Sequence, residues 1–474
     1  MLSRSLPAFA PIALLMLGSC GGASSRDTGA IVRNVVIFTV DTLRADFLSP
    51  YSDEVSNTPN YDRLAADSVL FERAYSPASL TNPALTSMLT GLQPTQHGVH
   101  VQNSGFREGI VSLPFIAQAS GLSTGSFLGN MCKFQDIPHT VYHDGWDRRF
   151  CGMMDDPENY SEQYLWDESI VTAGLDWISE QERPFLAWMH LMDPHAEHHP
   201  PPRLWDYETD KPREKFEQYV YYGELEALQV PPAKEVIERL RALYRAEVAG
   251  ADDQLGRVLD FFDAEGLTET TALIGGSDHG EELFETWSRY DHGLSMTEGV
   301  LWVPLMVRAP GLAPRRFESP VELAQVTPTV LELLEIDPPY EFCAPSLLAE
   351  NPSRGYAFSY GSTWVTSVKT ADKRYWKRHL KEAPTRVEGA WRLEAPWFTE
   401  PQLLCEYEPD SPTTPVFLPI AGENEKTAKR MIAGIEEFDR SLQKFGKGFK
   451  IDDPIILESL RRQGYIIDES DDSK

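Results

Sequence analysis

Continuous apolar runs that alternate with a helical pattern predict an α/β fold built on a largely parallel sheet. The runs cover residues 35–40, 185–192 and 271–274 and are each followed by polar residues. An unbroken apolar run is typical of a strand that is buried on both faces. Residues 235–262 carry apolar side chains at helical spacing between the second and third runs. In such a sheet the functional site lies beyond the carboxyl ends of the strands.

Shorter segments from about residue 346 onward predict a second, smaller domain. Residues 356–360 and 364–368 are candidate strands, and residues 423–445 are a candidate helix. We therefore expect a large domain over residues 33–345 and a smaller C-terminal domain over residues 346–474. A length of 474 residues is sufficient for this division.

The N-terminal segment predicts an export signal. Residues 1–19 hold one positive charge, Arg4, and a short apolar run before Cys20. Leu-Gly-Ser-Cys resembles the bacterial lipobox, in which the cysteine is lipidated; an ordinary signal peptide is the alternative. Residues 20–32 are then a flexible tether. We expect an exported chain, anchored to the periplasmic or outer-membrane face of the cell envelope only through lipid at Cys20, since no apolar run reaches 18 residues.

Charge and cysteine content narrow the expected partners and the compartment. The chain has 43 basic and 72 acidic side chains, a net charge of −29 that phosphate backbones would repel, so nucleic acid is not an expected partner. An oxidising compartment permits disulfides, and the four cysteines after Cys20 allow three pairings. These cysteines are Cys132, Cys151, Cys343 and Cys405. A bond between Cys132 and Cys151 would close a short loop.

Acidic residues follow each of the three predicted strands. Asp41 follows the first strand, Asp193 the second, and Asp278 with His279 the third, and we expect them to converge. Carboxylates and imidazole are suitable ligands for a divalent cation. Taken singly, an aspartate after a strand is more often a helix cap.

Residues 81–91 predict a short helix that starts at or just after Thr81. Pro83 suits the first turn, apolar residues follow at helical spacing, and Gly91 ends the segment. Backbone N–H groups at this terminus and the helix dipole would favour a tetrahedral oxyanion beside Thr81. The alternative is that Thr81 only caps the helix.

Seven short motifs occur in order along the chain: VDTLRAD (40–46), NTPNYDRLA (57–65), LTGLQPTQHGV (89–99), DPH (193–195), SDHGE (277–281), DHG (291–293) and VPL (303–305). QVTPTVL (residues 325–331) and LRRQGYI (460–466) extend the series. Together these motifs resemble those of the sulfatases of the alkaline-phosphatase superfamily. The resemblance implies an alkaline-phosphatase-like fold, in which a large mixed, mostly parallel sheet lies between helices and a smaller C-terminal α+β domain follows.

The resemblance also implies a metal site with an adjacent nucleophile. Asp41, Asp278 and His279 would hold one divalent ion, and the nucleophile Thr81 would be a further ligand. Ca²⁺ is the expected ion, with Mn²⁺ or Zn²⁺ as alternatives. Such an ion lowers the pKa of a bound hydroxyl and neutralises charge on the ester oxygens.

Other positions match residues that contact the substrate in the family. His195 and His292 would contact the substrate oxyanion or protonate the leaving group. Asn103 falls near a position that holds a non-bridging oxygen. The neighbouring His190, His198 and His199 crowd into one stretch with His195, and a solvated polar loop accounts for most of them.

The chain departs from the family at three positions. Thr81 stands where typical sulfatases carry the Cys or Ser that is oxidised to formylglycine, and Thr cannot give that aldehyde. Leu85 replaces the arginine of the maturation motif, and Thr42 replaces a second aspartate, which weakens a Ca²⁺ site. A catalytic chain would therefore use unmodified Thr81 as its nucleophile.

Three functional hypotheses follow from these observations. The first is a hydrolase of sulfate or phosphate esters, acting on a small-molecule or glycan anionic ester. The second is a phosphodiesterase or phosphonate monoester hydrolase, because cleavage of phosphorus esters needs no oxidised residue. The third is a non-catalytic relative that serves as a surface binding protein.

Overall fold

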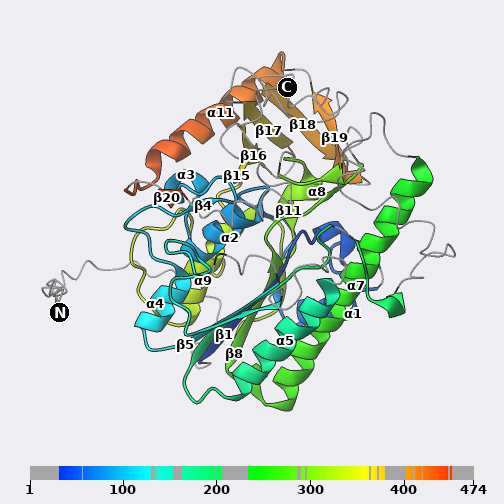
Figure 1. Ribbon diagram of the computed structural model, residues 1–474. Coiled ribbons are helices and arrows are strands. Elements are labelled where there is room, and N and C mark those ends of the chain that lie inside the picture. The colour runs from blue at the N-terminus through cyan, green and yellow to red at the C-terminus, as the bar shows by residue number, and fades with distance from the viewer. Residues whose placement is uncertain are drawn as a thin grey trace, which may run out of the picture.

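The computed structural model contains a large sheet between two helical layers and a smaller antiparallel sheet (Figure 1). The described residues are 31–55, 57–129, 134, 136–152, 163–196, 198–204, 233–285, 290–293, 296–361, 365–370, 373–378, 402–408, 411–418, 420–446 and 449–450.

The large sheet is mixed but mostly parallel at its centre. β1 pairs in parallel with both β7 and β8, and β5 pairs in parallel with β6 and β7, whereas β12 runs antiparallel to β2 and β8. The predicted fold class and its three buried strands are confirmed. In sheet order the strands are β13 (Arg315–Phe317), β2 (Val69–Phe71), β12 (Leu305–Arg308), β8 (Thr271–Ser277), β1 (Asn34–Val40), β7 (Phe185–Leu191), β5 (Ser123–Leu128) and β6 (Arg148–Cys151).

Helices cover both faces of this sheet, which explains why the central strands are apolar throughout. Along β1, Val35 and Ile37 pack into one core, while Val36 and Phe38 pack into the other. The predicted helix over residues 235–262 is α7. One layer comprises α1 (Pro59–Ala66), α5 (Gln163–Ser179) and α7 (Lys234–Ala264), and the other comprises α2 (Thr81–Thr90), α4 (Leu113–Ala119) and α9 (Val326–Leu333) (Figure 1).

The smaller sheet is antiparallel and packs against α11 (Glu423–Ser441). Both predicted strands in this region are present, and the predicted late helix ends four residues earlier, at Ser441 instead of residue 445. The sheet consists of β15 (Ala357–Gly361), β16 (Val365–Lys369), β17 (Lys373–Arg378), β18 (Gln402–Glu408) and β19 (Ser411–Leu418).

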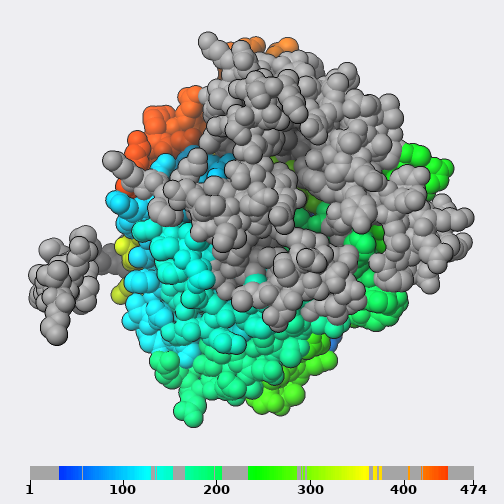
Figure 2. Space-filling view, viewed as in Figure 1, coloured from blue at the N-terminus to red at the C-terminus, as the bar shows by residue number. Residues whose placement is uncertain are grey.

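Direct contacts join the smaller sheet to the rest of the chain. The backbone N–H of Tyr360 on β15 donates to the Pro77 carbonyl over 2.8 Å. On β17, Arg374 is buried and donates to the Glu298 carboxylate over 2.9 Å. In Figure 2 the orange and red residues of α11 lie directly against blue and cyan residues from early in the chain.

Short elements complete the described structure. The short strands are β3 (Ala74–Tyr75), β4 (Ser104–Gly105), β9 (Glu282–Leu283), β10 (Tyr290–Asp291), β11 (Trp302–Val303), β14 (Val321–Glu322) and β20 (Phe449–Lys450). The short helices are α3 (Pro94–His97), α8 (Glu298–Leu301) and the 3-10 turns Ala45–Phe47, Pro202–Leu204, Leu267–Glu269 and Leu323–Gln325.

Several predictions fall outside the described residues: the signal over residues 1–19 with its lipid anchor, most of the tether, and the 460–466 motif. Within the described part, no helix is both long and apolar enough to cross a membrane. Cys151 is disulfide-bonded, and Cys132, its predicted partner in a short loop, lies outside the described residues. Cys343 and Cys405 are buried and form no disulfide, so none of the three pairings that use all four cysteines is present.

Candidate metal and ester-binding site

The carboxyl ends of β1 and β8 bring two aspartates side by side. Val40 pairs with Ser277 in parallel register, so Asp41 and Asp278 emerge next to each other, and both side chains are fully buried. The backbone N–H of Thr42 donates to Asp278 Oδ1 over 3.3 Å. The end of β1 is therefore tied to one oxygen of Asp278, while the other oxygen, Oδ2, has no hydrogen-bond partner.

His279 lies between these carboxylates and Thr81. Its Nε2 is 3.4 Å from Asp278 Oδ2, 3.8 Å from Asp41 Oδ1 and 3.3 Å from Thr81 Oγ1. Its Nδ1 is 2.9 Å from the Gly280 carbonyl, which orients the ring. The structure therefore brings together all four residues for which the resemblance implies metal binding.

Thr81 is the first residue of α2, as the sequence predicts, and the whole helix is buried. The N-terminus offers fewer N–H groups to a ligand than expected. The Asn82 N–H donates to Gln102 Oε1 over 2.7 Å, Pro83 has no N–H, and the Ala84 N–H donates to the Leu80 carbonyl. An oxyanion at Thr81 would thus depend more on the metal and the histidines than on this helix terminus.

His190 belongs to the same cluster, although its sequence context suggested a solvated loop. It lies within β7 in register with Thr39 of β1, and it is fully buried. One ligand atom each from Asp41, His190 and Asp278 lie within 4.8 Å of one another. The sequence signal that could have identified His190 was its place in the buried strand β7. Its register partner on β1, Thr39, lies two residues before Asp41.

The cluster fits a divalent cation. Both Asp41 oxygens, Asp278 Oδ2 and His190 Nε2 are buried and have no hydrogen-bond partner among the residues that the structure describes. Burial acts to raise the pKa of Asp41, but the neighbouring histidines lower it below its ordinary value. Burial and the charge of Asp41 raise the pKa of Asp278. Buried, unpartnered carboxylates are costly unless a cation neutralises them.

Two further histidines line the cluster. The His292 ring lies 4.5 Å from that of His279 and 5.1 Å from that of His195, measured between centroids. His292 Nδ1 is 3.1 Å from Glu281 Oε2, so a fully buried carboxylate orients it. Burial lowers the pKa of His195 to about 4, so this ring is neutral at neutral pH.

Asn103 lies in a half-buried turn next to the start of α2. The Asn82 side-chain amide holds this turn, donating to the carbonyls of Gln102 over 2.9 Å and Ser104 over 2.8 Å. Asn103 is therefore near Thr81, but no contact joins it to the metal cluster.

Other residues of the 190–199 stretch have structural partners. His198 is buried, with Nδ1 2.6 Å from Glu247 and Nε2 2.7 Å from the Tyr290 hydroxyl, so its assignment to a solvated loop is wrong. Asp193 is buried too, and burial together with the charges of Glu247 and Asp167 raises its pKa. Asp167 accepts the Asp193 N–H over 3.1 Å and also interacts electrostatically with Asp41, so this carboxylate group adjoins the metal cluster, and the convergence of Asp193 itself with Asp41 and Asp278 stays a prediction.

Leu85 shows how the chain accommodates the loss of the family's arginine. Its side chain is fully buried within the core cluster formed by α2, α4 and α9. That position therefore carries no charge and contributes to packing.

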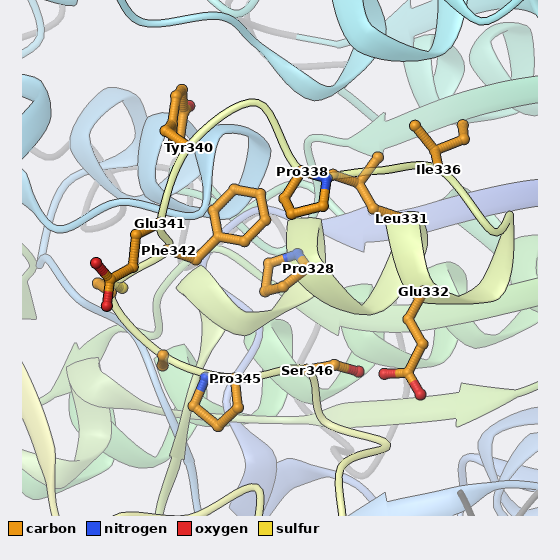
Figure 3. A pocket seen from close by; sticks show the side chains of 12 residues that line it. Pro328, Leu331, Glu332, Ile336, Pro338, Tyr340, Glu341, Phe342, Pro345 and Ser346 are labelled. Atoms are coloured by element: carbon orange, nitrogen blue, oxygen red, sulfur yellow. The ribbon is translucent and has the colours of Figure 1, made fainter. Parts of the chain in front are cut away.

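A separate cavity of about 550 Å³ lies at the opposite end of α2 (Figure 3). Pro328 and Phe342 line it, and the Tyr340 hydroxyl donates to the Thr90 carbonyl over 3.0 Å. The ten-residue length of α2 puts this cavity roughly 15 Å from Thr81. It is therefore separate from the metal cluster.

Comparison with known proteins finds similarity to sulfatases over most of the large sheet. The family model described as sulfatase matches residues 33–336. The uncharacterized sulfatase YidJ of Escherichia coli (strain K12) is 24% identical over 374 residues, covering 68% of this chain and 72% of its own length. An arylsulfatase of Clostridium perfringens is 24% identical over 373 residues, covering 65% of this chain and 76% of its own.

A solved structure supports the fold. The phosphonate monoester hydrolase of Agrobacterium radiobacter superposes with a TM-score of 0.67 at 20% identity, covering 86% of this chain and 95% of the other. Since the family model spans well over half of the sequence, the chain belongs to the sulfatase family of the alkaline-phosphatase superfamily, a family of sulfuric ester hydrolases.

Proposed function

We propose that the chain is a metal-dependent hydrolase of sulfate or phosphate esters that uses unmodified Thr81 as its nucleophile. The observation that carries this proposal is the position of Thr81 Oγ1. It is buried at the start of α2, 3.3 Å from His279 Nε2 and beside the Asp41–Asp278 carboxylate pair.

Asp41, Asp278, His279 and Thr81 would hold the metal. A bound divalent ion would neutralise charge on the ester oxygens and lower the pKa of the Thr81 hydroxyl, which is otherwise a poor nucleophile. Thr81 would release its hydroxyl proton to water, and Oγ1 would then bond to the sulfur or phosphorus atom as the bond to the leaving oxygen breaks. Water would later cleave the resulting ester of Thr81 and release the inorganic product.

His292 is the preferred general acid of this scheme. Glu281 contacts Nδ1 of the ring, so Nε2 is the nitrogen that would donate a proton to the leaving oxygen. His195 lies next to it, and its Nδ1 donates to the Ala196 carbonyl over 2.6 Å, so its Nε2 would donate to a non-bridging oxygen only after the ring takes up a second proton. Asn103 would contact another such oxygen from the turn beside α2.

The chemistry of Thr81 also favours a second candidate, a phosphodiesterase or phosphonate monoester hydrolase. Thr81 cannot become an aldehyde, and the arginine of the aldehyde-forming motif is replaced by the buried Leu85. A threonine ester of phosphorus needs no such oxidation. A surface binding protein without catalysis is the outcome if neither ester class reacts.

The substrate is proposed to be a small-molecule or glycan anionic ester. Because the net charge is −29, the overall field opposes such a substrate, and attraction must come from the metal and the histidines. Among the relatives, the Clostridium perfringens protein is named an arylsulfatase. We further propose that the chain is exported and lipid-anchored at Cys20.

The test is a turnover screen of the metal-loaded full chain. The substrates are an aryl sulfate, an aryl phosphate, a bis-aryl phosphate and an aryl phosphonate, each offered to wild type, Thr81→Ala and Thr81→Ser. We expect turnover that is lost in Thr81→Ala and partly retained in Thr81→Ser, which keeps a hydroxyl group. Preference for diester or phosphonate would favour the second candidate, and turnover that survives in Thr81→Ala would refute Thr81 as the nucleophile.

A further inference from the structure

A second imidazole reaches the Asp41 carboxylate from β7. His190 Nε2 is 3.8 Å from Asp41 Oδ2, while His279 Nε2 is 3.8 Å from the other oxygen, Oδ1. His190 is fully buried, and its Nε2 has no hydrogen-bond partner. We propose that His190 is a ligand of the metal, and that the site selects a borderline transition metal such as Zn²⁺ over Ca²⁺.

The surroundings of His190 present an Nε2 lone pair to the site. Thr39 Oγ1 is 2.9 Å from His190 Nδ1, accepts the Trp188 indole N–H over 2.9 Å and donates its own proton to the Met189 carbonyl. A hydroxyl has one donor and two acceptor positions, so Thr39 can accept from Nδ1–H while it donates to the Met189 carbonyl. Neutral imidazole with its proton on Nδ1 is the form that binds metal through Nε2.

The spacing of the donor atoms suits short metal–ligand bonds. Zinc bonds of about 2.0–2.1 Å at tetrahedral angles place ligand atoms roughly 3.3–3.4 Å apart. His279 Nε2 lies 3.3 Å from Thr81 Oγ1, 3.4 Å from Asp278 Oδ2 and 3.8 Å from Asp41 Oδ1. His190 Nε2 lies 3.8 Å from the other Asp41 oxygen, and ligand atoms of His190, Asp41 and Asp278 lie within 4.8 Å of one another. The first two separations match tetrahedral zinc bonds, whereas those to Asp41 are wider.

The types of donor also disfavour calcium. Ca²⁺ takes six to eight oxygen ligands, whereas two of the five protein groups here are imidazoles and Thr42 replaces a possible carboxylate. Imidazole suits zinc and other first-row transition metals, whose affinities exceed that of Ca²⁺ at such sites. His190 thus compensates for the carboxylate that the chain lacks. This inference rests on the metal site of the proposed function, but not on its turnover.

The first experiment uses the wild-type full chain, stripped of metal by a chelator. Equilibrium dialysis against Zn²⁺, Mn²⁺ and Ca²⁺, followed by elemental analysis, gives stoichiometry and relative affinity. X-ray absorption at the zinc edge counts imidazole ligands. We expect one Zn²⁺ per chain, bound at least 100-fold more tightly than Ca²⁺, with two or more imidazoles. Affinity for Ca²⁺ equal to that for Zn²⁺, or a single imidazole, would overturn the proposal.

The second experiment compares variants of His190 with a matched histidine. His190→Ala should weaken Zn²⁺ binding by at least about 100-fold and remove one imidazole from the absorption spectrum. His143→Gln is the control, because this partly exposed histidine pairs with Asp144 outside the cluster. An unchanged imidazole count in His190→Ala would refute the assignment.

Thr39 provides a test that leaves every proposed ligand in place. Thr39→Val removes the group that orients His190, and we expect a 10- to 100-fold loss of Zn²⁺ affinity, about the usual effect of removing such a partner. Thr39→Ser keeps the hydroxyl and should restore binding; equal affinities in the two variants would contradict the ligand role. If His190-dependent zinc binding persists while no ester is turned over, the proposed function fails and this inference stands.

Discussion

The backbone after His279 passes so close to α8 that a single methyl group should displace the site. A Cβ atom added at Gly280 would lie 2.1 Å from the Gly299 carbonyl oxygen and 3.0 Å from Arg44 Cγ. A carbon–oxygen contact normally needs roughly 3.3 Å, so Gly280→Ala requires a shift of about 1 Å in this segment. The shifted segment carries Asp278 and His279, two proposed ligands.

A displacement of about 1 Å at reacting groups costs on the order of 100-fold in rate. We therefore expect Gly280→Ala to lower kcat/KM on the best ester substrate by that order and to weaken metal binding. Steady-state kinetics and equilibrium dialysis measure the two effects. Thermal unfolding of each variant separates a displaced site from a failure to fold.

Two other glycines allow the same substitution to be compared at positions where the added Cβ overlaps less with its neighbours. A Cβ at Gly276 would lie 3.1 Å from the Pro304 carbonyl oxygen, a milder overlap within β8, and one at Gly434 on α11 would meet nothing within 4 Å. The loss should therefore be negligible for Gly434→Ala, small for Gly276→Ala and large for Gly280→Ala. Full metal affinity and activity in folded Gly280→Ala would refute the reasoning.

Three further predictions concern stability. Glu298→Ala removes the buried carboxylate that pairs with Arg374, and the free energy of unfolding measured in urea should fall by about 3–5 kcal/mol; no change would contradict this pairing. Burial raises the pKa of Asp167 from 3.8 to about 7, so the folded state binds the proton more tightly than the unfolded state. The free energy of unfolding of the wild type should therefore fall as the pH rises between these two pKa values. Asp167→Asn should flatten the dependence of the free energy of unfolding on pH. A variant profile that runs parallel to the wild-type profile would contradict this prediction. Tyr340→Phe removes the hydroxyl bonded to Thr90, and should cost about 0.5–1.5 kcal/mol by the same assay, with a larger loss indicating rearrangement.

Local sequence signals were sufficient where a short stretch of chain decides its own structure. The apolar runs predicted β1, β7 and β8 because strands covered on both faces are mostly apolar. Pro83 and Gly91 delimited α2, with Thr81 as its first residue, because one fixes a helix start and the other permits the left-handed turn at its end.

Long-range pairing decided what local signals could not. His190 looked like part of a polar stretch, yet the parallel register places it next to Thr39 and puts its Nε2 at Asp41. The start of α2 looked rich in unpaired N–H groups, but Gln102, twenty residues on, takes one of them. Neither contact can be predicted from the spacing of residues that are close in the sequence.

The sequence by itself therefore determined the α/β class, the family, and the nearby strand-end residues Asp41, Asp278 and His279. Only the tertiary structure decided which histidine joins them, and that His198 pairs with Glu247 in a buried group to which Asp193 also belongs. The physical reason is that periodicity and chain breakers act within a few residues, whereas a metal site depends on atoms that sheet register brings together from distant segments.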